Sequence, residues 1–156
     1  IARGFELRPT RTPLDLGGGL VFLGQIERTN SFEAQEPLGT VLGPEGAQAD
    51  RLLDDSALVH LGPGRIDIVT GCSHSGICNI IEYARKVTGV SRVGFVLGGF
   101  HLDQSRPELV AATCAYFAGA GVERVYACHC TDTYAKLALS RVCAVEEAGV
   151  GLLLEA

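Results

Sequence analysis

The chain has 156 residues, a net charge of −5 and no strongly basic segment. Its length fits one domain that buries roughly two thirds of its unfolded surface, and a composition that is 47% apolar and 20% charged excludes a disordered or nucleic-acid-binding chain. The hydrophobic runs are far shorter than the roughly 20 residues that span a bilayer, and the first residues lack the apolar core of a signal peptide. We therefore expect a soluble, cytoplasmic protein with no membrane partner.

The N-terminal third gives weak secondary-structure signals. Residues 1–19 are rich in turn-forming residues and lead into a predicted strand at 20–26, LVFLGQI. Residues 27–56 contain Gly, Pro and acidic residues with no sustained period, which predicts an irregular loop or flap. Loops of this length inside a compact domain are usually functional or mobile.

From residue 57 onward the pattern is regular. ALVHL and RIDIVTG flank GPG, which predicts a β-hairpin. Helices are predicted at 76–87, 105–121 and 131–149, and strands at 93–99, 122–128 and 150–156. Ser105 and Glu108 form a candidate capping box for the second helix. The alternation predicts an α/β fold, with residues 1–156 in a single domain.

Three of the four histidines occupy equivalent positions, each between a predicted strand and a predicted helix. These are His74 after RIDIVTG, His101 after VGFVLGG and His129 after VERVYA. Ligands of layered α/β folds bind where strands end, so adjacent parallel strands would bring the three imidazoles together. A solvated turn is the alternative explanation for each histidine taken alone. His60 lies within a strand pattern and is not an expected ligand.

Three neutral imidazoles suit a divalent metal and leave one position open for a water that the metal acidifies. We therefore predict a metal site with His74, His101 and His129 as ligands. Zinc is the first candidate, and iron and manganese are the alternatives. Asp103, two residues after His101, is the acidic residue best placed to support these ligands, whereas Asp132 is expected to start a helix.

The six cysteines are expected to be thiols, because a cytosolic chain rarely keeps disulfides. Cys72, Cys78, Cys128 and Cys130 lie near two of the histidines, which leaves a closed structural zinc site as a further alternative. In an extended CHC segment, Cys128 and Cys130 would point away from His129, and Cys78 falls in a helical turn. We expect Cys72 and Cys128 to contact the metal ligands without binding the metal themselves.

Three motifs carry a family resemblance: TGCSHSGICNII at 70–81, LGGFHL at 97–102 and CHCTD at 128–132. In order and spacing they resemble the C-terminal half of the metallo-β-lactamase superfamily, and most closely its branch of dihydropterin ribofuranosyl-aminobenzene phosphate synthase-like proteins. The resemblance implies an αββα sandwich with one or two metal ions at one edge, in which His74 and His129 are ligands. His101 stands where the superfamily usually has a metal-bridging aspartate, which is a departure from the pattern.

The leading metal motif of the superfamily, His-x-His-x-Asp-His, does not occur in the sequence, and the sequence contains no methionine. We therefore expect a chain that is incomplete at its N-terminus, or one that a second chain or homo-oligomerisation completes. Half of a sandwich would otherwise leave an apolar face uncovered.

The leading functional hypothesis is a metal-dependent hydrolase that uses a metal-bound hydroxide on a small ester, with phosphate esters as the candidate substrates. The alternative is a non-catalytic metal-binding or assembly module that lacks the first metal motif.

Overall fold

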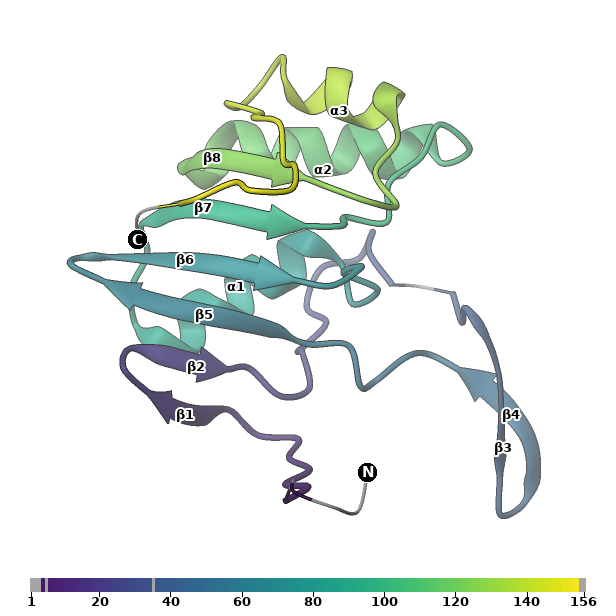
Figure 1. Cartoon of the computed structure of the whole chain (residues 1–156). Helices are drawn as coiled ribbons and strands as arrows, with labels where there is room; N and C mark the ends of the chain where they lie inside the picture. Colours follow the sequence, from purple (N-terminus) through teal and green to yellow (C-terminus); the bar gives the residue numbers. More distant parts are fainter. Residues whose placement is uncertain (1–3, 5, 35, 155–156) are drawn as a thin grey trace.

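The computed structural model describes residue 4, residues 6–34 and residues 36–154 (Figure 1). Within these residues, six strands form one sheet in the order β1-β2-β5-β6-β7-β8. The strands are β1 (Leu14–Gly17), β2 (Leu20–Phe22), β5 (Ala57–Gly62), β6 (Arg65–Thr70), β7 (Val93–Gly98) and β8 (Val122–Ala127). Neighbours are antiparallel from β1 to β6, while β6, β7 and β8 are parallel. The three strands that precede the predicted metal ligands therefore end at the same edge, as the sequence analysis required.

The described helices are α1 (Ile77–Thr88), α2 (Pro107–Ala120) and α3 (Thr133–Leu139). Strand residues in the alternating positions Val59, Ile66, Ile68 and Val96 are fully buried in one core with residues of α1 and α2. Each such aliphatic side chain stabilises the fold by about 1.5–3 kcal/mol. This core holds β6 to β8 in register and so fixes the loops that follow them. The predicted α/β class is confirmed.

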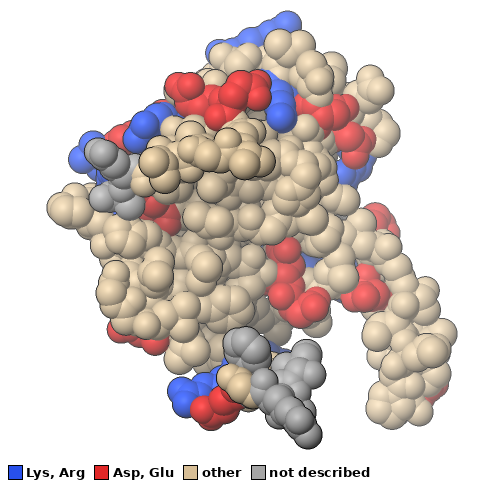
Figure 2. All heavy atoms as spheres, viewed as in Figure 1, with Lys and Arg blue, Asp and Glu red and all other residues tan. Residues whose placement is uncertain are grey.

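The other side of the sheet, here called the front face, is only thinly covered. It carries Leu14, Leu16, Leu20, Leu58 and Val69, which expose 39–52% of their surface. Alternation along each strand places these side chains opposite the buried ones. Figure 2 shows this side of the molecule as a broad area with few charged side chains. The C-terminal residues Val150, Leu152 and Leu154 line one apolar cavity with Val69 on this face.

Several predicted elements differ from the structure. In the segment 27–56, predicted to be irregular, β3 (Gly39–Gly43) and β4 (Gly46–Asp50) form a hairpin that projects away from the sheet (Figure 1). Its strands bury almost nothing, with Leu42 85% exposed, so they show no hydrophobic alternation. Strand β1 was likewise missed in the turn-rich region, where its four residues are all exposed.

The helix ends give one confirmed prediction, the start of α3 at Asp132, and two errors. Gly121, at a φ of 65°, ends α2, and the side chain of Asp132 accepts a 2.8 Å hydrogen bond from the Ala135 N–H at the start of α3. The capping box of Ser105 is wrong, because the Ser105 N–H donates to Asp103 at 2.9 Å and α2 begins at Pro107.

The third predicted helix ends at Leu139 rather than at residue 149. Residues 144–146 turn back to the edge of the sheet, where Ala144 and Glu146 make backbone hydrogen bonds of 2.8 Å with Val125 of β8. The predicted final strand is also wrong over residues 150–154, and residues 155–156 lie outside the described chain. In the part of the chain that the structure describes, no helix has the length and hydropathy needed to cross a membrane.

Candidate metal centre

Three loops follow β6, β7 and β8 and are joined to one another at the edge of the sheet. We call this edge the rim, and define it as residues 71–76, 98–104 and 128–132. The Ser73 hydroxyl donates to the Gly99 carbonyl at 2.6 Å, and the Gly99 N–H donates to the Gly71 carbonyl at 2.8 Å. The Leu102 N–H donates to the Cys130 carbonyl at 3.0 Å. The three loops therefore form one hydrogen-bonded unit.

Each loop of the rim contains one non-glycine residue in the left-handed conformation. Ser73, His101 and Cys130 have φ values of 58°, 50° and 48°. This conformation costs roughly 1–2 kcal/mol for an L-residue, and such strain clusters at functional sites. The rim thus holds three strained residues: His101 is itself a candidate ligand, and Ser73 and Cys130 are next to His74 and His129 in the chain.

The first group of donor atoms at the rim contains His74, His101 and Asp55. The two imidazole rings meet edge to face with centroids 4.8 Å apart. Asp55 lies with its Oδ1 atom 3.9 Å from His74 Nδ1, and its Oδ2 atom accepts a 2.9 Å hydrogen bond from the Ser75 N–H. Burial, aided by the positive charge of Arg106, lowers the pKa of His101, so its imidazole favours the neutral form that binds metals.

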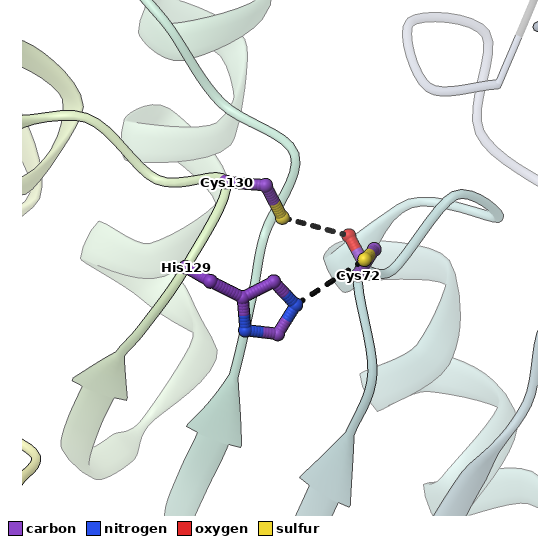
Figure 3. Close-up of side chains that lie close together, drawn as sticks. All are labelled: Cys72, His129 and Cys130. Carbon is purple, nitrogen blue, oxygen red and sulfur yellow. Dashed lines mark hydrogen bonds between the residues drawn. The ribbon is translucent and has the colours of Figure 1, made fainter.

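The second group contains Cys72, His129 and Cys130 (Figure 3). One donor atom from each residue lies within 4.8 Å of the other two. The Cys72 sulfur is 3.2 Å from His129 Nε2, and the Cys130 thiol donates to the Cys72 carbonyl at 3.7 Å. Among the described residues, this is the set of three or more such side chains whose donor atoms gather closely enough to hold a metal ion.

A buried polar network supports the loop that carries His74. The carboxylate of Glu33 accepts hydrogen bonds of 2.9 Å from the Cys78 and Asn79 N–H groups at the start of α1, and one of 2.6 Å from the Asn30 side chain. The Asn79 side chain in turn accepts from the Thr29 N–H at 2.9 Å. Burial raises the pKa of Glu33. The segment 27–34 is therefore fastened to α1 directly behind His74.

A cavity of about 410 Å³ opens beside the first group. His74 and His101 lie on its wall, together with apolar side chains such as Phe32, Phe100 and Leu109. Arg106 also lines the cavity and is held there by the His101 carbonyl and by the Asp103 carboxylate at 3.2 Å. An apolar pocket with a few polar groups is the usual form of a small-molecule site.

The structure separates the predicted site residues into two groups and leaves some outside both. His74 and His101 lie together, and His129 lies with Cys72. Asp103 bonds to Ser105 and Arg106, and hydrogen bonding to Ser105 lowers its pKa.

Two cysteines and one histidine lie away from both groups. Cys128 donates to the Tyr126 carbonyl and lines the front-face cavity, while Cys78 is buried in α1. His60 sits 3.8 Å from Asp67 on β6, away from the rim.

Sequence reasoning missed Asp55 and Glu33, and it considered Cys130 only for a closed zinc site that the spacing disfavoured. Asp55 and Glu33 come from the segment without periodicity, and their partners lie 20 to 46 residues away in the chain. Cys130 was expected to point away from His129, but its left-handed backbone breaks the alternation of an extended segment. The sequence signal that could have indicated Cys130 as a ligand is the run Cys128, His129, Cys130.

The donor atoms at the rim fit a divalent metal. Neutral imidazole and thiolate are the usual ligands of zinc, and a carboxylate next to an imidazole is the usual support for such a ligand. The Gly99 backbone leaves the required space, because a Cβ atom there would lie 2.5 Å from the Cys130 sulfur and 2.9 Å from His129 Nε2.

No protein-family model matches the chain. It is 31% identical over 125 residues to the 7,8-dihydropterin-6-methyl-4-(beta-D-ribofuranosyl)-aminobenzene-5'-phosphate synthase of Methanocaldococcus jannaschii, a match that covers 78% of this chain and 42% of the synthase. It is 29% identical over 137 residues to an uncharacterised protein of the same archaeon, covering 88% of this chain and 50% of that protein.

The crystal structure of a metal-dependent hydrolase of the beta-lactamase superfamily matches with a TM-score of 0.80 and 27% identity. This match covers 98% of the present chain and 58% of that hydrolase. The fold and the sequence similarity are therefore those of the β-lactamase superfamily of metal-dependent hydrolases. The similarity to the archaeal synthase confirms the predicted resemblance to that branch. The chain spans about half the length of the curated relatives it matches, 42% and 50%.

Proposed function

We propose that the rim is the metal centre of a hydrolase that acts on a small ester, and that phosphate esters are its substrates. The observation that carries this proposal is that hydrogen-bonded strand-end loops with strained residues present three histidines at one edge of the sheet, with His74 and His101 beside a cavity. The similarity to a metal-dependent hydrolase supports the same reaction class. The chain matches only part of that hydrolase, so the hydrolytic activity is itself part of what we propose.

In this proposal, His74 and His101 hold one metal ion beside the cavity, and His129, in the other donor group, holds a second. A bound divalent metal would supply Lewis-acid polarisation of the ester and acidification of a water molecule. Asp55 orients the His74 ring through Nδ1 and so keeps Nε2 available as a ligand. The lowered pKa of His101 keeps its ring neutral near pH 7.

Arg106 supports the choice of a phosphate ester. Its guanidinium lines the cavity next to His101 and is fixed in place by Asp103. A guanidinium binds phosphate oxygens with two parallel hydrogen bonds. The similar synthase is named for a 5'-phosphate compound, which supports an anionic substrate of the same kind here.

The test is metal-dependent hydrolysis of bis(p-nitrophenyl) phosphate and p-nitrophenyl phosphate by the purified protein. We expect the His74→Ala variant to bind less zinc and to lose hydrolysis, whereas His60→Ala, which removes a histidine of the front face, keeps both. Metal binding with no hydrolysis of any ester would instead support the alternative of a non-catalytic metal-binding module. Hydrolysis that survives His74→Ala and His101→Ala would contradict the proposal.

We also propose that a second layer of polypeptide covers the front face in the working protein. The exposed leucines of β1, β2 and β5 lie side by side there, and monomers rarely expose a continuous apolar patch. The solved hydrolase extends beyond the part that this chain matches, which supports additional polypeptide as the occupant.

Light scattering together with binding of an apolar dye tests the covering of the front face. We expect the chain alone to bind the dye or to self-associate, and a homodimer would make a second copy the occupant. A stable monomer that binds no dye would contradict the proposal.

We place the protein in a reducing compartment, with the cytoplasm as the first candidate. All six cysteines are free thiols, including the exposed Cys130. An oxidising compartment would tend to pair neighbouring thiols such as those of the half-buried Cys72 and the exposed Cys130.

A further inference from the structure

We propose that Cys72, His129 and Cys130 form a metal position of their own at the β8 end of the rim, with two thiolate ligands and one imidazole ligand. Such a position selects a thiophilic ion such as zinc over magnesium or manganese, because soft thiolates bind the latter poorly. This inference does not depend on hydrolysis, since it concerns the donor atoms alone.

The distances are close to those that a metal ion requires. Zinc bonds of about 2.3 Å to sulfur and about 2.0 Å to nitrogen, at tetrahedral angles, put the donor atoms roughly 3.5–3.8 Å apart. The Cys72 sulfur and His129 Nε2 are 3.2 Å apart, and all three donor atoms lie within 4.8 Å of one another. Rotation of side chains is therefore sufficient to complete the geometry.

The backbone is built to bring these side chains together. Cys130 would point away from His129 in an extended segment, but its φ of 48° turns it back. Figure 3 shows the Cys130 and His129 side chains both directed toward Cys72, which comes from the neighbouring loop after β6. This left-handed conformation costs roughly 1–2 kcal/mol for an L-residue.

Gly99 is the second backbone feature that lets these side chains lie close together. A Cβ atom at this position would lie 2.5 Å from the Cys130 sulfur, 2.7 Å from the His129 carbonyl oxygen and 2.9 Å from His129 Nε2, so a side chain here would displace its neighbours. The glycine between β7 and His101 therefore leaves room for the two donor atoms to approach the sheet edge.

The position is accessible from solvent and has room for a fourth ligand. His129 and Cys130 are exposed and Cys72 is half-buried, so an ion, a water molecule or a substrate atom can reach the centre of the group. Cys78 shows the contrast, because it is 2% exposed in α1 and packed in the core. Three protein ligands with an open fourth position differ from a closed structural zinc site.

The experiment is cobalt(II) substitution followed by near-ultraviolet and visible absorption of the full chain. We expect a sulfur-to-cobalt charge-transfer band in the wild type and in His74→Ala, because the latter leaves both thiolates intact. The band should weaken in Cys72→Ser and in Cys130→Ser, which each keep one thiolate, and disappear in the double variant, and the zinc affinity of each single variant should fall on the order of 100-fold or more.

Cys128→Ser is the matched control, since it makes the same change next to His129 in a side chain that faces the Tyr126 carbonyl instead. It should keep the band. Because Cys130 is exposed, Cys130→Ser should have the same metal-free melting temperature as the wild type. Equal melting temperatures would exclude misfolding as the cause of a change in the band. Cobalt binding without a thiolate band, or a band that persists in the double variant of Cys72→Ser and Cys130→Ser, would overturn this inference. Failure of hydrolysis alone leaves the band in place and bears only on the proposed function.

Discussion

The two groups of donor atoms at the rim are held in place in different ways. The His74 group depends on residues far away in the sequence, because Asp55 and Glu33 reach it from the segment before β5. The Cys130 group depends on its own loops, through a left-handed backbone and the space above Gly99. Long-range polar contacts therefore position one half of the site, and local backbone geometry positions the other. Substitutions should damage the two halves separately.

The largest effect is expected from Glu33→Ala. The variant leaves the Cys78 and Asn79 N–H groups without their acceptor in a buried position, so the free energy of unfolding should fall by about 3 kcal/mol. Chemical denaturation measures this, with the exposed Glu36→Ala as the control that should change little. Cobalt bound by Cys72 and Cys130 should keep its thiolate band, since only the His74 half loses its support.

Gly99→Ala should damage the other half. The added methyl group meets the Cys130 sulfur and His129, so the free energy of unfolding should fall by about 1–3 kcal/mol and the thiolate band should be lost. The control is Gly119→Ala, in α2 and with open space around it, which should stabilise the protein by about 0.5–1 kcal/mol. A stable Gly99→Ala protein with an intact band would refute the role given to this glycine.

Asp55→Asn should have a smaller effect, confined to the His74 group. The amide oxygen can still accept the Ser75 N–H, so the free energy of unfolding should fall by no more than about 1 kcal/mol. The lost charge beside His74 Nδ1 should weaken zinc binding at that group by roughly 10- to 100-fold. Zinc titration by calorimetry measures this, and an equal loss at the thiolate position would argue against two separate groups.

The smallest effect is a pH dependence from Glu33. Burial raises its pKa in the folded protein, so folding favours the protonated carboxyl. Its contribution to stability is complete below its unfolded pKa of about 4.5 and is lost as the pH rises through the higher folded value. Between about pH 4 and about pH 8, the unfolding free energy of the wild type should therefore fall relative to that of Glu33→Gln. The opposite slope would mean that the hydrogen bonds outweigh burial.

Elements that bury a face could be predicted from the sequence, and exposed ones could not. Strands β5 to β8 and helices α1 and α2 fill the core, so their patterns alternate or repeat clearly. The β3–β4 hairpin is exposed on both faces and left no such pattern. The early end of α3 depends on a backbone contact with Val125 of β8, which local sequence does not contain.

The candidate site divides in the same way. The three histidines could be placed at strand ends because strand and helix signals flank each of them. Asp55 and Glu33 could not, because their roles arise from contacts across 20 to 46 residues. Cys130 adopts a left-handed backbone conformation that a residue with a side chain disfavours, so residue propensities do not predict this turn.

The most direct test of the central claim is anomalous diffraction at the zinc absorption edge from crystals of the zinc-loaded protein. The account predicts one peak between Cys72, His129 and Cys130, and zinc density beside His74 and His101 at the mouth of the cavity. Zinc bound elsewhere on the chain, with no peak at the rim, would contradict the assignment of this edge of the sheet as a metal centre.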